Sequence, residues 1–184
     1  MIETERLTLR AWREEDVVAL HEIGQDARVM ELLGPLTTME DARGLVSGQM
    51  VNQSLFGHCF WPIERRSDGR LLGLCGLNPA PKATPLEGEI EIGWRLASDA
   101  WGQGYGLEAA RASLAWGWAN LDVPTIAAIT VPANRRSWGP MERLGMTRFP
   151  EEDFDHPALA PGDPLRAHIL YRIARPPDGP TRAR

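Results

Sequence analysis

The sequence has little cysteine and no long apolar run. Its 184 residues include two cysteines, Cys59 and Cys75, without a CxxC spacing, so neither a disulfide framework nor a zinc site is indicated. No signal-peptide segment opens the chain, and no stretch approaches the ~20 apolar residues of a membrane span. We therefore expect a cytoplasmic protein that uses no metal and no membrane.

The sequence also lacks an excess of basic residues. Its net charge of −5 argues against a nucleic-acid partner and is compatible with a cationic substrate. The apolar content of 43% and the charged content of 24% are typical of a globular domain. We predict one domain over residues 1–174 and a flexible C-terminal tail over residues 175–184, which contains three prolines.

Hydrophobic periodicity predicts a strand, two helices, three strands, a helix, a strand, a helix and a last strand. The second helix should begin at Thr38, where Asp41 completes a near capping box, and should bury Leu45, Met50 and Val51. The predicted strands cover residues 7–11, 56–64, 70–77, 87–96, 125–131 and 166–173, and the later helices cover residues 107–121 and 134–144. Hairpins in the middle and helical crossovers later imply a mixed sheet.

A glycine-rich turn, Trp101-Gly102-Gln103-Gly104-Tyr105-Gly106, separates the fourth predicted strand from the third helix. A turn that feeds a helix leaves backbone N–H groups unpaired, and the helix dipole adds positive charge there. The turn is therefore a candidate phosphate cradle, although an ordinary tight turn would look the same.

In this order and spacing, three motifs resemble the GCN5-related N-acetyltransferase (GNAT) superfamily, most closely its RimJ/RimL-type branch. They are Glu91-Ile92-Gly93-Trp94-Arg95-Leu96, the glycine turn, and Asn134-Arg135-Arg136-Ser137 followed by Glu142 to Met146. The resemblance implies an α/β fold with a mixed, mostly antiparallel sheet, splayed fourth and fifth strands, and about four flanking helices.

The resemblance further implies that acetyl-CoA is the co-substrate. The amides of Gln103, Gly104, Tyr105 and Gly106 would bind its pyrophosphate, with Gly102 in the same turn. Trp101, where the family commonly has Gln or Arg, suits packing or the adenine end. The exposed backbone of Trp94 and Leu96 would bind the pantetheine arm, Asn134 would hold it from the other side, and a backbone N–H near Trp94 or Arg95 would meet the oxyanion.

The resemblance also implies transfer of acetyl to a primary amine by direct attack in a ternary complex. Glu91 is the first candidate for the general base, and Glu87, Glu89 and Glu91 are alternatively one solvated strand face. Met141 occupies the position of a tyrosine acid in many relatives, so Ser137 is the candidate proton donor to the leaving thiolate.

Candidate acceptor residues are His156, in the loop over residues 150–164, and Glu89. The acceptor itself is either a protein N-terminus or a small-molecule amine, and a homodimer is compatible with the family. Two other functions compete with this one. A dinucleotide-binding oxidoreductase is disfavoured because Leu107 stands where the last glycine of GxGxxG is expected. A module that binds acyl-CoA without catalysis stays open because of Met141.

Overall fold

The structure is a computed structural model that describes residues 1–177, so the rest of the predicted tail lies outside the described residues. The strands are β1 (Ile2–Glu3), β2 (Leu7–Leu9), β3 (Phe60–Arg65), β4 (Leu71–Pro79), β5 (Ile90–Leu96), β6 (Thr125–Thr130), β7 (Thr147–Arg148), β8 (Phe154–Asp155) and β9 (Ala167–Ala174). The α-helices are α1 (Asp16–Gly24), α2 (Ala27–Met30), α3 (Met39–Phe56), α4 (Tyr105–Asn120) and α5 (Arg135–Arg143). None of the described helices is long and apolar enough to cross a membrane.

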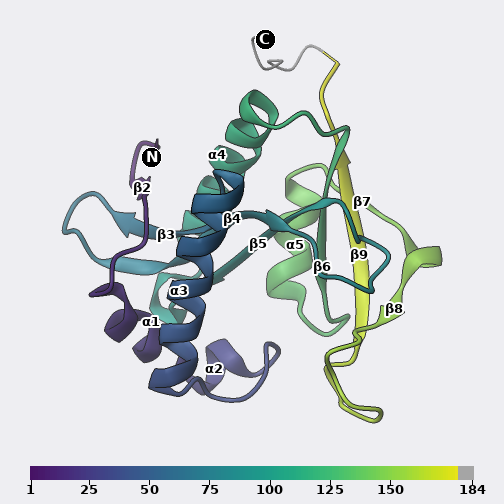
Figure 1. Ribbon diagram of the computed structural model, residues 1–184, viewed down its shortest axis with the longest axis horizontal. Coiled ribbons are helices and arrows are strands. Elements are labelled where there is room, and N and C mark those ends of the chain that lie inside the picture. The colour runs from purple at the N-terminus through teal and green to yellow at the C-terminus, as the bar shows by residue number, and fades with distance from the viewer. Residues whose placement is uncertain (178–184) are drawn as a thin grey trace.

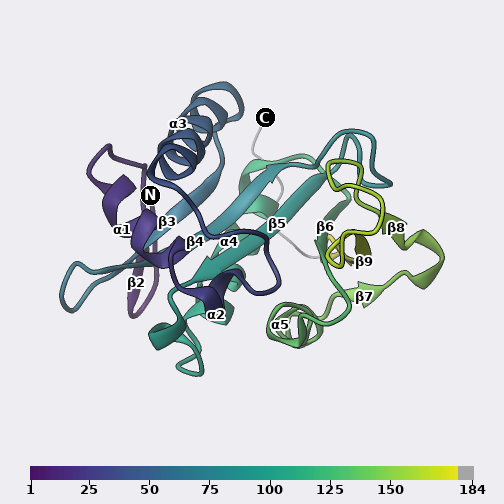
Figure 2. The same ribbon diagram turned by 90° about the horizontal axis from the view of Figure 1, so that it is seen from below.

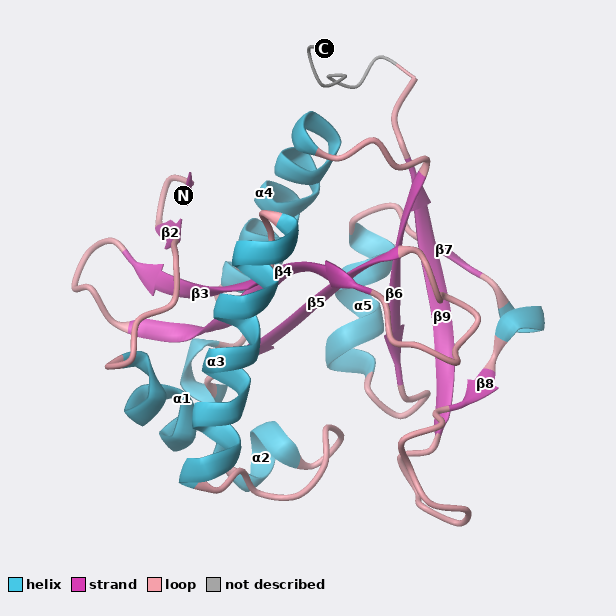
Figure 3. Cartoon of the chain, in the orientation of Figure 1, coloured by secondary structure: helices cyan, strands magenta, loops and turns pink. Residues whose placement is uncertain are grey.

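The sheet has the strand order β1-β2-β3-β4-β5-β6-β9-β7, with β8 attached to β9. All pairs are antiparallel except β5 and β6, which are parallel and meet in a single residue pair, Glu91 opposite Ala127. Beyond that pair the strands separate, and in Figure 3 β5 runs obliquely while β6 and β9 run nearly vertically. The mixed, mostly antiparallel sheet with splayed fourth and fifth predicted strands, now β5 and β6, is confirmed.

Helices cover both faces of the central strands. α4 packs on the face that carries Leu77 and Leu96, because Gly117 and Gly106 of the helix lie directly over these side chains. The opposite face lies beneath α3, where Gln49 accepts hydrogen bonds from the backbone of Phe60 and from the side chain of Asn78. Figures 1 and 2 show α3 across the sheet and α5 on the other side, next to β6. The opening between β5 and β6 therefore lies between helical layers.

The ends of α3 follow from local chemistry. The predicted capping box is present, since the Thr38 hydroxyl accepts the Asp41 N–H and the Asp41 carboxylate accepts the Thr38 N–H. The helix ends at Gly57, whose φ of 77° suits glycine. Because α3 continues through Phe56, the strand predicted to start there begins only at Phe60.

The buried side of α3 differs from the prediction. Ala42 and Val46 are buried, whereas Met50 and Val51 are 43% and 54% exposed. The helix turns its small and polar residues toward the sheet, where Gln49 serves the strand backbone. The prediction for Met50 and Val51 was therefore wrong, because it chose the buried face of the helix from apolar character alone.

The chain leaves β9 at a well-anchored residue. The predicted tail begins with Arg175, whose N–H donates to the Pro124 carbonyl at 2.8 Å. Its guanidinium donates to the Trp118 carbonyl at 2.7 Å and stands over the Trp118 ring. This residue ties the end of β9 to the end of α4.

Candidate active site

The glycine turn presents unpaired amides at the start of α4. Gly104 is the N-cap residue with a φ of 83°, and Gly102 has a φ of 73°, a conformation that suits glycine. Within residues 1–177, no amide from Gly102 to Leu107 donates a hydrogen bond to the protein; the first helical bond runs from the Glu108 N–H to the Gly104 carbonyl. With the helix dipole behind them, these amides can bind an anion.

A cavity of about 350 Å³ opens in front of the turn. Its lining includes the turn glycines, Trp94 and Leu96 of β5, Asn134 and Ser137 at the start of α5, and Leu33 between α2 and α3. Its charged lining residues are all arginines, namely Arg28, Arg95, Arg136 and Arg143. The residues present therefore fit a phosphate-bearing ligand with a long arm.

Some of these arginines were missed from the sequence. Arg136 lies inside the Asn134-Arg135-Arg136-Ser137 motif, and Arg143 follows it by two helical turns of α5, so helical periodicity offered a signal. Arg28 reaches the cavity from α2, a four-residue helix that no periodicity reveals.

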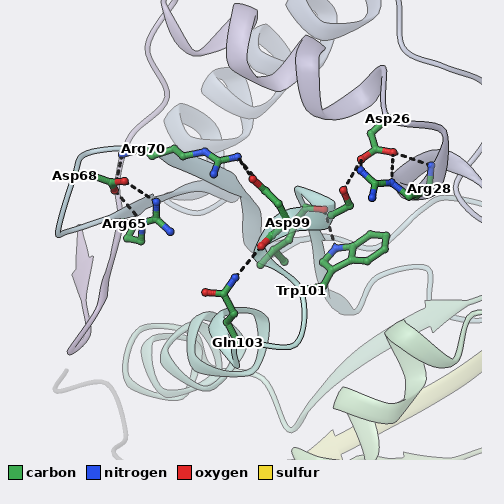
Figure 4. A network of polar contacts seen from close by, with 10 residues as sticks. Asp26, Arg28, Arg65, Asp68, Arg70, Asp99, Trp101 and Gln103 are labelled. Carbon is green, nitrogen blue, oxygen red and sulfur yellow. Dashed lines mark hydrogen bonds and ion pairs between the residues drawn. The ribbon is translucent and has the colours of Figure 1, made fainter.

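The turn is fixed from outside by side chains. The Arg6 guanidinium donates to the Gln103 carbonyl at 2.9 Å and pairs with Glu108 at 2.6 Å. The Gln103 side chain donates to the Asp99 carbonyl at 2.7 Å, as Figure 4 shows. The carboxylate of Asp99 in turn pairs with Arg70. Because the side chains of Arg6 and Gln103 bind carbonyls, the amides of the turn remain free.

Trp101 closes one side of the cavity. Its indole N–H donates to the Leu96 carbonyl at 3.0 Å, the orientation visible in Figure 4. The Arg136 guanidinium lies 4.5 Å from the centre of the indole, within the range of a cation–π contact. Trp101 therefore bridges the end of β5 and α5.

The free edge of β5 faces the same cavity. The Ala97 N–H donates to the Leu72 carbonyl at 2.8 Å, so every second residue of β5, counted back from Ala97, directs its backbone groups toward β4. Alternation then turns the backbone groups of Trp94 and Leu96 away from β4, toward the side where β6 has separated. The Leu96 carbonyl is already taken by Trp101, so the Leu96 N–H and both groups of Trp94 stay available to an extended ligand.

Two polar side chains at the start of α5 complete this wall. Asn134 is buried and lines the cavity, and among residues 1–177 its side-chain amide has no hydrogen-bond partner. Ser137 bonds through its N–H to the Asn134 carbonyl at 2.9 Å, while its hydroxyl makes no hydrogen bond within the described chain. Both groups are thus free to bind a ligand.

A second cavity of about 270 Å³ lies on the α3 side of the opening. Phe60 lines this cavity and shows which face of β5 points into it. A Cβ added at Gly93 would lie 2.9 Å from the Phe60 ring, so the face that carries Gly93 is turned toward the cavity. Glu91 and Arg95, two positions before and after Gly93, share that face. This cavity meets the first at Leu33, Trp94, Arg95 and Ser137, which line both.

Glu91 has the properties of a general base. Burial raises the pKa of its carboxyl from 4.5 to about 7, because a charged carboxylate is poorly solvated there. Within residues 1–177 the carboxyl forms no hydrogen bond or ion pair, so nothing holds its charged form. A carboxylate with this pKa can accept a proton near neutral pH.

Neither predicted acceptor residue lines either of these two cavities. The Glu89 carboxylate forms an ion pair with the Arg172 guanidinium at 2.7 Å, so Glu89 links its loop to β9. His156 lies beside β8 and β9, with its ring 5.0 Å from that of His168, because the β8–β9 hairpin forms on the edge of β9 away from β5. The assignment of Glu89 and His156 to the acceptor site stays a prediction.

The described residues contain no cluster of His, Cys, Asp or Glu that could hold a metal ion. Both cysteines are buried, and burial raises the pKa of each thiol to about 12.

A mixed sheet parted between two strands, with a helix N-terminus at the mouth, defines a GNAT-type acetyltransferase fold. Residues 6–147 match the family model of the acetyltransferase (GNAT) domain, and the chain belongs to this family. The predicted family is confirmed, and the dinucleotide-binding alternative is wrong. The "uncharacterized N-acetyltransferase p20" of Bacillus licheniformis is 33% identical over 73% of this chain and 75% of its own.

Solved structures share the fold along nearly the whole chain. A GNAT-family acetyltransferase from Bacillus anthracis superposes with a TM-score of 0.77 at 28% identity, over 95% of this chain and 98% of its own. RimL, a ribosomal L7/L12 alpha-N-protein acetyltransferase in complex with coenzyme A, superposes with a TM-score of 0.75 at 20% identity, over 93% and 95%. At that identity the likeness to RimL is one of fold.

Proposed function

We propose that this protein transfers the acetyl group of acetyl-CoA to a primary amine by direct attack in a ternary complex. The observation that carries the proposal is the meeting of the two cavities at the parted strands. One cavity has arginines and free amides for an anionic ligand, and the other holds Glu91. GNAT acetyltransferases, the family to which the chain belongs, transfer acetyl groups.

Each end of acetyl-CoA finds suitable groups in the first cavity. The free amides from Gly102 to Leu107, with Arg136 and Arg143, would bind the phosphates. The Trp94 carbonyl, the Leu96 N–H and the side-chain amide of Asn134 would bind the amides of the pantetheine arm. Acetyl-CoA supplies the activated acetyl group, and these contacts would direct it toward the second cavity.

The second cavity supplies groups for the proton transfers. Glu91 would take the proton of the attacking amine, directly or through water, because its pKa of about 7 lies close to that of an α-amine, ~8. The Trp94 N–H would stabilise negative charge on the carbonyl oxygen. Ser137 would donate to the departing thiolate, which with a pKa of ~8.5 needs little help.

The acceptor is proposed as an α-amine. A lysine amine, with a pKa of ~10.4, would demand a stronger base than Glu91. RimL is named for the α-amine of ribosomal L7/L12, which supports this class of amine for a chain of the same fold. A homodimer and a cytoplasmic location stay predictions.

The test is thiol release from acetyl-CoA with a panel of amines: peptide N-termini, lysine peptides, amino acids, polyamines and aminoglycosides. Mass spectrometry identifies the acetylated product. We expect turnover of at least one α-amine and its loss in Glu91→Gln with acetyl-CoA binding retained. Binding of acetyl-CoA without turnover of any amine would instead identify a non-catalytic acyl-CoA-binding module.

A further inference from the structure

The second cavity contains a cation to which the proposed acetyl transfer assigns no role. Arg95 lies partly buried on β5, where the two cavities meet, and lines both of them. Within residues 1–177 its guanidinium forms no hydrogen bond and no ion pair. Burial lowers the pKa of Arg95 below its usual range, as expected for a cation that has lost water without gaining a counter-ion.

Other arginines of the fold have partners when they are partly buried. Arg10 binds Asp16 at 2.7 Å and also Glu64, and Arg172 binds Glu89 at 2.7 Å. A guanidinium that is taken out of water with no acid beside it costs stability. A ligand that brings an anionic group to Arg95 would remove that cost.

The direction of the Arg95 side chain follows from the register of β5. Arg95 pairs with Leu74 of β4, and Leu74 lines the second cavity. Gly93, on the same face, lies against the ring of Phe60. The Arg95 side chain therefore leaves the strand on the α3 side, with Glu91, and away from α4.

Glu91 and Arg95 are the charged residues that line this cavity, and the other lining residues are apolar or neutral. The two lie four residues apart on one strand, so their Cα atoms are separated by about 13 Å at ~3.3 Å per residue. No ion pair joins them. A ligand between them meets a proton acceptor at one end and a fixed cation at the other.

We propose that the acceptor is a small amine that carries a carboxylate, such as an amino acid, with its amine toward Glu91 and its carboxylate bound by Arg95. The proposal rests on the proposed function. The planar fork of a guanidinium matches the two oxygens of a carboxylate, and a cavity of about 270 Å³ suits a small molecule. The same cation repels the second amine of a polyamine or an aminoglycoside.

The experiment compares each of several amino acids with its own amide, in which a neutral carboxamide replaces the carboxylate. Thiol release from acetyl-CoA gives kcat/KM, expressed per neutral amine because the amide's amine is less basic. Spermidine and a peptide with an N-terminal serine and no acidic side chain complete the panel. We expect wild type to prefer a carboxylate over its amide by about tenfold or more in kcat/KM.

The variants assign this preference to Arg95. Arg95→Gln should raise KM for the amino acid and leave the amide unchanged, and Arg95→Lys should keep part of the preference. Arg43→Gln removes an exposed arginine of α3 that lines neither cavity and should behave as wild type.

The outcomes separate this inference from the proposed function. Equal use of acid and amide by wild type, a preference for spermidine or the serine peptide, or an unchanged ratio in Arg95→Gln overturns the carboxylate inference while acetyl transfer stands. Absence of thiol release with every amine overturns both. The wild-type ratio needs no variant, so a poorly folding Arg95→Gln leaves the test intact.

Discussion

Replacement of Glu91 by glutamine tests the proposed base. The base accepts a proton only as the carboxylate, so kcat/KM should fall about tenfold per pH unit below its pKa of about 7. Protonation of the amine produces a second acidic limb. The pH of that second limb should rise with the pKa of the acceptor amine, whereas the limb due to Glu91 should fall at the same pH with every acceptor. Glu91→Gln should lose the fixed limb and about 10²–10⁴-fold in rate.

The same substitution should stabilise the fold at alkaline pH. The folded pKa of Glu91 lies above its ordinary value, so the stability linked to the neutral carboxyl is complete below pH 4.5 and is lost as the pH rises through about 7. At about 1.4 kcal/mol per pKa unit, the loss for wild type is about 3 kcal/mol. Glutamine cannot ionise, so its free energy of unfolding should not show this loss.

Urea unfolding at pH 5 and pH 8, together with pH–rate profiles, measures both effects. Glu5→Gln removes an exposed carboxylate that forms no hydrogen bond or ion pair with the described residues and should change neither. The reasoning about Glu91 is refuted if Glu91→Gln keeps the fixed acidic limb, or if it is less stable than wild type at pH 8. Burial that raises a pKa must also penalise the ionised fold, so the two measurements check one cause.

Three further substitutions test the rest of the site. Gly104→Val should raise KM for acetyl-CoA about tenfold or more. The control Gly69→Val, at a similar φ of 70° in the β3–β4 hairpin, should cost a similar ~1–2 kcal/mol of stability and leave KM unchanged. An equal increase of KM in both variants would show that the glycine turn does not bind acetyl-CoA. Ser137→Ala should lower kcat by about tenfold or less with unchanged acetyl-CoA binding by calorimetry, and weakened binding would instead make Ser137 a binding residue. Glu89→Gln should lower the free energy of unfolding by about 1–2 kcal/mol through the lost Arg172 pair. A moved acidic limb of the pH–rate profile in this variant would instead make Glu89 a catalytic candidate.

Local sequence signals pointed to the residues that are proposed to bind acetyl-CoA. Some features depend only on residues a few positions apart, so they can be predicted without the fold. They are the glycine turn, the alternation around Glu91 and the capping box at Thr38. The buried face of α3 could not be predicted in this way. Met50 and Val51 are more apolar than Gln49, yet Gln49 faces the sheet because the backbone of Phe60 needs its side-chain oxygen.

The role proposed for Arg95 in binding the acceptor required the fold, because it depends on which groups are absent around its side chain. The sequence assigned Arg95 to the backbone contacts of the cofactor, and no local pattern says that a guanidinium lacks an acidic neighbour. Arg28 and Leu33 reach the cavities from a segment that contains only one short helix, α2. Their positions follow from the packing of α1 and α3, which brings this segment to the opening.

The two cavities have consequences for the order of binding, because they share their walls. Trp94, Arg95 and Ser137 line both, so a pantetheine arm bound along Trp94 would form one side of the acceptor cavity. Acetyl-CoA would then bring the thioester beside Glu91 and narrow the space in which an amine can turn. Bound acetyl-CoA should therefore raise the affinity for the acceptor, and by linkage the acceptor should raise the affinity for acetyl-CoA by the same factor. Calorimetric titration of CoA with and without saturating acceptor measures this coupling, and identical CoA affinities in both titrations would show that the shared wall does not couple the two halves of the site.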